Sequence, residues 1–230
     1  MRLKLESETS RLLYLLLLTD VVLVFLHVLG KTDVLATTLV DLDVDGGYAE
    51  IFQYVKEFWI ASLLVLLYVV RRKGCYLAWA CLFFYFLADD SLQIHEQVGA
   101  YLAQTLDLQP AFNLRAVDLG ELLVTAVAGT VLFLAIASTY FSGDKEVRRF
   151  SNRLFPLMVL LAICGVIFDM VEIMFVWGRP LWDLIEDGGE LLAMSLILWY
   201  VFGQRPSQNR PVAPNTPTKP LQSDLDTNLP

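Results

Sequence analysis

Residues 122–140 read LLVTAVAGTVLFLAIASTY, a run without a charged side chain. At 1.5 Å per residue, a helix over this run would be roughly 28 Å long, close to the thickness of the hydrocarbon core of a bilayer. Asp118 and Glu121 stand just before the run. The stretch therefore predicts a transmembrane helix, over 116–140, with an apolar body and carboxylates at one end.

Five further apolar segments have comparable lengths and complete the set of predicted spans. The chain of 230 residues is 56% hydrophobic and 18% charged, which excludes an ordinary soluble domain of this size. The ten-residue alternation of a membrane barrel is absent. The sequence thus predicts an all-α integral membrane protein, a bundle of about six transmembrane helices within residues 1–204, whose other spans are 12–29, 51–70, 75–97, 154–177 and 181–202.

The distribution of Lys and Arg predicts the orientation of the bundle. Thirteen basic residues precede the first span or follow the second, fourth and sixth, against three in the alternate connections. Basic residues are enriched on the cytoplasmic side, so both termini are predicted to be cytoplasmic, in the cell (inner) membrane. Residues 205–230 hold six of the nine prolines among polar residues and are predicted to form a disordered cytoplasmic tail.

Carboxylates crowd the outward-facing halves of all six predicted spans. The inner stretches 58–70, 122–140 and 154–168 hold no charge. An ionised group at the bilayer centre costs about 2.5 to 3.5 kcal/mol, so these acids must be protonated, hydrated or bound to cations. The thirteen acids are Asp20, Glu57, Asp89, Asp90, Glu96, Asp118, Glu121, Asp169, Glu172, Asp183, Glu186, Asp187 and Glu190.

Helical spacing places several of these acids on shared faces, together with two histidines. Carboxylates with imidazoles suit zinc, manganese or iron. The predicted metal ligands are His95, Glu96, Asp89, Asp187 and Glu190, with Glu172 or Asp169 as a general base. Gly188 and Gly189 would allow a ligand or a neighbouring helix to approach closely. Further predicted members of the polar site are Asp20, His27, Glu57, Asp90, Asp118, Glu121 and Glu186.

The loop after the first span suggests a second, calcium-binding site. Asp41, Asp43 and Asp45 form a D-x-D-x-D-G opening within residues 41–50, as in calcium loops. Phe52 occupies the position of the bidentate glutamate that such loops require. The alternative is an acidic, solvated loop with a Gly-Gly turn.

Two motifs carry a resemblance to other proteins. The D-x-x-x-x-H-E stretch from Asp90 to Glu96 and the E-D-G-G-E stretch from Glu186 to Glu190 resemble uncharacterised multi-span inner-membrane proteins of bacteria. The resemblance implies a membrane location and no particular activity.

Three functions fit the predicted site. The first is a metal-dependent hydrolase that activates water against a lipid or another membrane-delivered substrate. The second is a proton- or cation-coupled transporter or channel, although the inner halves of the spans lack an acidic path. The third is a membrane scaffold in which the acids form a structural polar core. The expected ligand is a lipid, a small molecule or an ion, and no nucleic-acid partner is expected.

Overall fold

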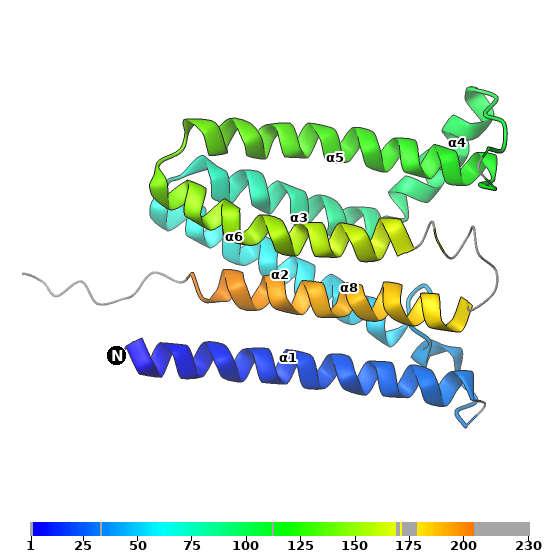
Figure 1. The fold of residues 1–230 in the computed structure, drawn as a ribbon, viewed down its shortest axis with the longest axis horizontal. Coiled ribbons are helices and arrows are strands. Elements are labelled where there is room, and N and C mark those ends of the chain that lie inside the picture. The colour runs from blue at the N-terminus through cyan, green and yellow to red at the C-terminus, as the bar shows by residue number, and fades with distance from the viewer. Residues whose placement is uncertain (1, 33, 112, 169–170, 172–178, 205–230) are drawn as a thin grey trace, which may run out of the picture.

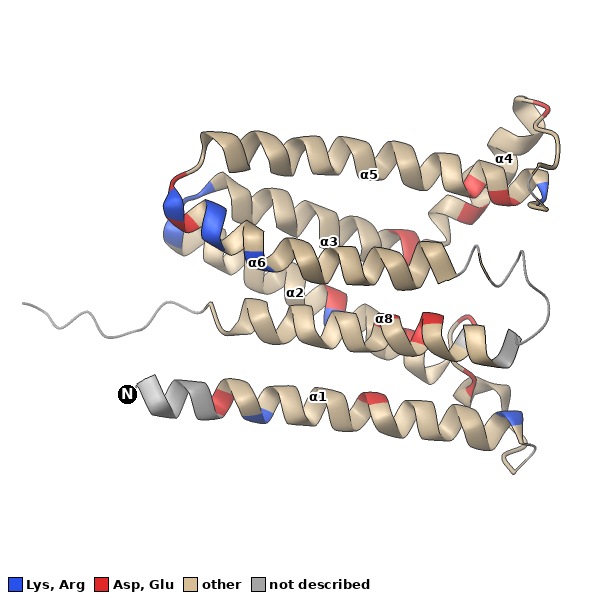
Figure 2. Ribbon diagram, in the orientation of Figure 1, with Lys and Arg blue, Asp and Glu red and all other residues tan. Residues whose placement is uncertain are grey.

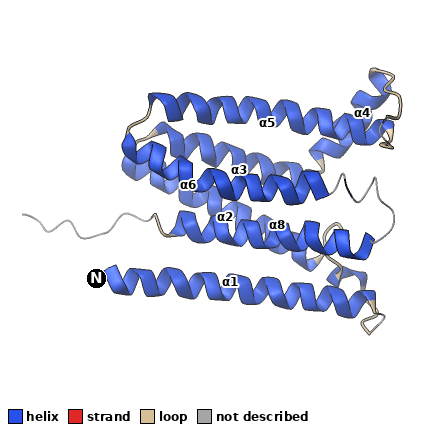
Figure 3. Cartoon of the chain, viewed as in Figure 1, coloured by secondary structure: helices blue, strands red, loops and turns tan. Residues whose placement is uncertain are grey.

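Helices account for nearly all of the residues that the computed structural model describes, namely 2–32, 34–111, 113–168, 171 and 179–204 (Figure 3). No strand occurs within these ranges. The prediction of an all-α fold is confirmed. The elements are α1 (Arg2–Lys31), η1 (Thr38–Val40), α2 (Tyr48–Arg71), α3 (Gly74–Leu92), α4 (Ile94–Thr105), α5 (Ala116–Ser142), α6 (Lys145–Ala162), the π-helix η2 (Ile163–Phe168) and α8 (Arg179–Phe202).

The long helices lie side by side along one axis, as Figure 1 shows. The first residues of α1 and the last residues of α8 lie at the same end of this bundle (Figure 1). The connections from α2 to α3 and from α5 to α6 lie at that end too, whereas α4 and the loop after α1 lie at the other. We call the latter the loop end of the bundle.

Five described helices are long and apolar enough to cross a membrane, and they indicate a bilayer environment. They are Glu8–Lys31, Tyr48–Arg71, Gly74–Leu92, Ala116–Ser142 and Lys145–Phe168. The sixth predicted span falls on α8, which has 24 residues but carries a cluster of acids in its first half. Parts of two predictions, residues 169–170 and 172–177 of the fifth span and the tail 205–230, lie outside the described residues.

The predicted third span, 75–97, is not one continuous helix. α3 ends at Leu92, Gln93 adopts a left-handed conformation with φ of 50°, and α4 starts at Ile94. Asp89 fixes this break, because its Oδ1 accepts a hydrogen bond of 2.8 Å from the backbone N–H of His95. The composition turns polar here, since residues 89–97 read DDSLQIHEQ, but helical spacing alone does not show the side-chain contact that breaks the helix.

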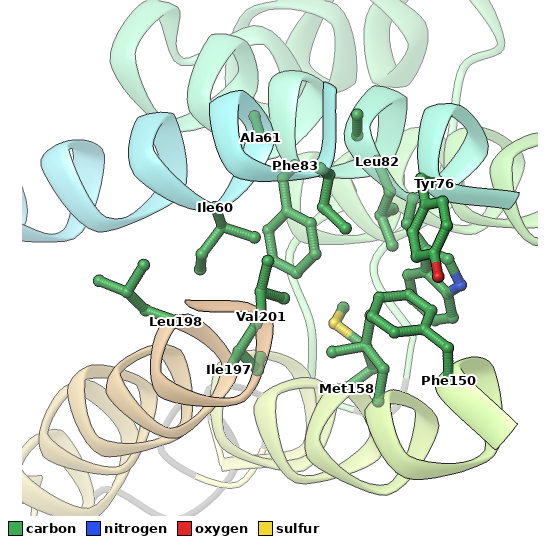
Figure 4. Packing of buried hydrophobic residues seen from close by; sticks show 14 of the residues in the cluster. Ile60, Ala61, Tyr76, Leu82, Phe83, Phe150, Met158, Ile197, Leu198 and Val201 are labelled. Carbon is green, nitrogen blue, oxygen red and sulfur yellow. The ribbon is translucent and has the colours of Figure 1, made fainter. Parts of the chain in front are cut away.

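The apolar core occupies the part of the bundle that holds few charges. Ile60, Phe83 and Ile197 are fully buried where α2, α3 and α8 meet, and Figure 4 shows these side chains converging with those of α6. Trp79 is also fully buried and donates from Nε1 to Ser151 Oγ at 3.2 Å, so its one polar atom is satisfied. Close packing of this kind is the main force that associates helices in lipid.

Acidic and basic residues separate along the bundle, as predicted from the sequence. Figure 2 shows Lys and Arg concentrated at the end opposite the loop end, and most Asp and Glu of the helices nearer the loop end. At the basic end, Arg71 Nη1 pairs with Glu146 Oε1 at 2.7 Å and Lys73 Nζ with Asp144 Oδ2 at 2.8 Å. These pairs connect the α2–α3 junction to the start of α6.

Candidate functional site

A cavity of about 760 Å³ opens among α2, α3, α4, α5, α6, η2, α8 and the loop before α2. This volume falls in the range of small-molecule binding sites and exceeds what one ion needs. We call it the acidic cavity, because eleven carboxylates line it. They are Asp43, Asp45, Glu50, Glu57, Asp89, Asp90, Glu96, Glu121, Glu186, Asp187 and Glu190.

All five predicted metal ligands line the acidic cavity. Asp89 comes from α3, His95 and Glu96 from α4, and Asp187 and Glu190 from α8. Four of the seven further predicted members, Glu57, Asp90, Glu121 and Glu186, also line it. The helices thus bring together groups that lie up to 133 positions apart in the chain, from Glu57 to Glu190.

Asp89 and His95, two of the predicted ligands, are in contact across the α3–α4 break. Asp89 Oδ1 accepts from the His95 backbone N–H, and Oδ2 lies 3.2 Å from the His95 Nδ1. Nδ1 is buried and has no hydrogen-bond partner among the described residues, so the contact between Asp89 and His95 Nδ1 is one of charge and proximity. The Asp89 carboxylate beside the ring raises the pKa of His95 above its ordinary value.

Two glycine contacts shape the cavity wall. A Cβ on Gly189 would lie 2.5 Å from Cys164 Sγ, and one on Gly165 would overlap the Glu190 carboxyl. The absent side chains let η2 pack directly against α8 and leave room for Glu190. The close-packing interpretation of Gly189 therefore holds, while Gly188 has only ordinary contacts. A π-helix at such a wall is typical of functional sites.

Asp20 is not among the residues that line the cavity. It belongs instead to a buried cluster in which Lys56 Nζ lies 3.3 Å from Asp20 Oδ1 and donates to the Leu191 carbonyl at 2.8 Å. The Ser195 hydroxyl donates to Asp20 Oδ2 at 2.6 Å. Lys56 is fully buried and Asp20 is 6% exposed. This cluster joins α1, α2 and α8, so Asp20 has a structural role.

His27 and Asp118 are also absent from the cavity lining. The buried His27 accepts a 3.0 Å hydrogen bond at Nδ1 from the Leu42 backbone N–H, which holds the loop after α1. Asp118 is fully buried, and its Oδ1 accepts from Arg115 Nε at 2.9 Å and from Nη2 at 2.6 Å, while its Oδ2 accepts from Nε at 3.2 Å. It also accepts from the Arg115 backbone N–H and so caps the start of α5.

The three aspartates of the predicted calcium loop have side-chain partners. Lys31 Nζ lies 3.0 Å from Asp43 and 3.6 Å from Asp41, and Gln93 Nε2 donates to Asp45 Oδ2 at 2.7 Å. Asp43 and Asp45 also line the acidic cavity. Calcium binding by this loop stays a prediction.

The model of a family described as a domain of unknown function, DUF8692, matches residues 12–204. The chain belongs to this family. No curated protein and no solved structure matches it. The family match spans every helix from α1 to α8, so the acidic cavity lies within the DUF8692 domain.

The described side chains of this DUF8692 domain do not form a closed metal site in their present conformations. Within the described part of the chain, no three His, Cys, Asp or Glu side chains converge tightly enough to hold an ion. Asp169 and Glu172, the predicted general bases, lie outside the described residues, as does the side chain of Asp183. Metal binding therefore stays a prediction, and it requires side-chain rotation within the cavity.

Sequence reasoning missed one buried polar residue of the cavity. Gln53 is 8% exposed, lines the cavity and stands four residues before Glu57 on α2. That spacing puts both side chains on one helix face, which was the available signal. Gln53 carries no charge, so a search for ionisable residues in the spans did not include it.

The Asp89–His95 contact gives a direct spectroscopic prediction. The chain has two histidines, so selectively labelled histidine yields two sets of NMR signals, and the variant His27→Gln assigns them. We expect Asp89→Asn to lower the pKa of His95, because the neighbouring negative charge that favours the imidazolium is lost. Glu8→Gln, at an exposed site on α1, should leave the titration unchanged. An identical His95 titration in Asp89→Asn would show that the pair does not form.

Proposed function

We propose that this chain crosses a bacterial inner membrane six times, with both termini cytoplasmic, and that the acidic cavity opens outward and binds a divalent metal ion. The separation of charge supports this orientation, since basic residues concentrate at the end where the N-terminal residues of α1 and the end of α8 lie (Figure 2). The cavity then faces the extracytoplasmic side. Zinc, manganese and iron are the favoured metals.

The observation that carries the proposal is the Asp89–His95 pair on the wall of a cavity rich in carboxylates. Asp89 Oδ2 lies 3.2 Å from His95 Nδ1, so a small rotation of the imidazole would let Nδ1 donate to this carboxylate and leave Nε2 to bind a metal. Such a carboxylate–histidine arrangement is common among metal-binding histidines. His95 stands directly before Glu96, which also lines the cavity. Asp187 and Glu190 approach from α8 and would complete the ligand set.

Apolar cavity walls favour a hydrolase of lipid or membrane-delivered substrates as the more specific function. Leu82, Phe133, Met158 and Met194 line the cavity together with the acids. A bound divalent ion lowers the pKa of water and polarises carbonyl or phosphoryl oxygens. The protein's own groups would orient His95 through Asp89, hold the substrate's apolar part against these side chains and keep bulk water from it.

Elemental analysis of the detergent-purified chain tests the metal proposal. We expect about one zinc, manganese or iron per chain after loading and dialysis, and at least a tenfold loss of affinity in His95→Ala. Asp89→Asn should lose about 10- to 100-fold, as is usual when the partner of a metal-binding histidine is removed.

His27→Gln is the matched control, because His27 lies outside the cavity lining and glutamine can still accept from the Leu42 N–H. This variant should retain the metal. Equal retention in His95→Ala, or no retention of any of the three metals by the wild-type chain, would overturn the proposal.

A further inference from the structure

Several buried side-chain atoms in the wall of the acidic cavity, Tyr85 Oη and His95 Nδ1 among them, have no hydrogen-bond partner in the described residues, and two of these atoms are neighbouring acceptors on one helix. They are Gln53 Oε1 and Glu57 Oε2, one helical turn apart on α2. The side chains are 8% and 1% exposed, and both line the cavity. Buried polar atoms are almost always satisfied, so these two indicate a bound group that brings its own donors.

The surroundings of this pair are also rich in acceptors. The carboxyl of Asp90 lies within hydrogen-bonding reach of Glu57, and the Asp90 carbonyl already accepts from the Tyr54 hydroxyl at 3.1 Å. Arg115 is the only Lys or Arg among the described lining residues, and Asp118 holds its guanidinium. A ligand here must therefore supply N–H or O–H donors, and a positive charge would suit it best.

Away from the loop end, the cavity becomes apolar. Along α5 its lining passes from Glu121 to Phe133, which is twelve residues or about 18 Å further along the helix. Along α8 it passes from Glu186 to Met194, about 12 Å further. Leu82 and Met158 face the same region, next to the core shown in Figure 4. The part of the cavity furthest from the loop end is therefore suited to an alkyl chain.

We propose that the acidic cavity binds a cationic amphiphile, an alkylammonium compound. Its ammonium donates to Gln53 Oε1 and to the carboxyls of Glu57 and Asp90, and its chain lies against Leu82, Phe133, Met158 and Met194. This inference rests on the proposed function, because it names the substrate class of the same site. Anionic lipids are disfavoured, since eleven carboxylates line the cavity.

Ligand-induced stabilisation of the full chain in lipid nanodiscs tests this proposal. The probes are octylamine, 1-octanol and octanoate, added to EDTA-treated protein so that no metal contributes. We expect octylamine alone to raise the unfolding temperature in a saturable way. The octyl chain partitions into the bilayer equally for every variant, so a difference between variants reports the site.

Glu57→Gln removes the charge and one of the two acceptor oxygens of that carboxyl, and Gln53→Met removes the amide acceptor, both at nearly constant side-chain size. Each should weaken the apparent affinity for octylamine at least tenfold. Glu8→Gln makes the same charge change at an exposed position and should bind normally. If Glu57→Gln does not fold, Gln53→Met carries the test, because it leaves every carboxyl in place.

Several outcomes would overturn the inference. One is an equal effect of octylamine and octanol, and another is unchanged octylamine binding in both cavity variants. A third is stabilisation by Mn²⁺ or Ca²⁺ alone that depends on Glu57 while octylamine has no effect, which would assign the acceptors to a metal. Metal retention by the wild-type chain and by His95→Ala is measured on the same preparations. That comparison tests the proposed metal site independently, so failure of the alkylammonium proposal can be told apart from failure of the metal proposal.

Discussion

Lys56→Met is expected to lower the free energy of unfolding by about 3–5 kcal/mol, the cost of breaking a buried ion pair by removing one partner. Lys56 is fully buried, and its ammonium contacts Asp20, the Leu191 carbonyl and Ser195. Without it, the Asp20 carboxylate stays 6% exposed with the Ser195 hydroxyl as its remaining hydrogen-bond donor among the described residues. The loss should be visible in reversible unfolding of the detergent-solubilised chain by SDS.

A double-mutant cycle separates the ion pair from a simple packing defect. Asp20→Asn combined with Lys56→Met removes both charges, so we expect the double variant to be more stable than Lys56→Met alone. Lys145→Met, at an exposed position in α6, is the control and should change stability by less than about 0.5 kcal/mol. A double variant no more stable than the single one would contradict the assigned pairing.

Gly120→Ala is expected to separate α4 from α5 and to destabilise the bundle by about 3 kcal/mol, the upper end for overpacking. A Cβ on Gly120 would lie 2.8 Å from the carbonyl carbon of Gly99 and nearer still to its oxygen. Both partners are backbone, so no side-chain rotation can relieve the overlap. Because α4 carries His95 and Glu96, we also expect weaker metal retention.

Gly129 supplies the matched control in the same helix. A Cβ there meets nothing within 4 Å, so Gly129→Ala should be neutral or should stabilise α5 by up to about 1 kcal/mol. Thermal unfolding of the two variants in detergent gives the comparison. If Gly120→Ala unfolds at the wild-type temperature, then α4 does not pack against α5 through these glycines.

Which acids meet in one cavity was only partly predictable from the sequence. The chain order and the helical period placed Asp187 and Glu190 on one face, and both line the acidic cavity. Asp20 has the same depth and residue type, yet it pairs with Lys56. No local sequence feature distinguishes Asp20 from Asp187 and Glu190, because their different roles depend on which neighbouring helix each helix face contacts.

The sequence by itself determined the helical class, the positions of the long apolar helices and the separation of charge along them. These features follow from composition and the 3.6-residue period, which act within each segment. Only the tertiary structure decided the break at Gln93, the contact of Asp89 with His95 and the unsatisfied acceptors at Gln53 and Glu57. The reason is that a hydrogen bond between helices depends on their relative rotation, which packing at positions such as Gly99 and Gly120 sets and which no single segment specifies.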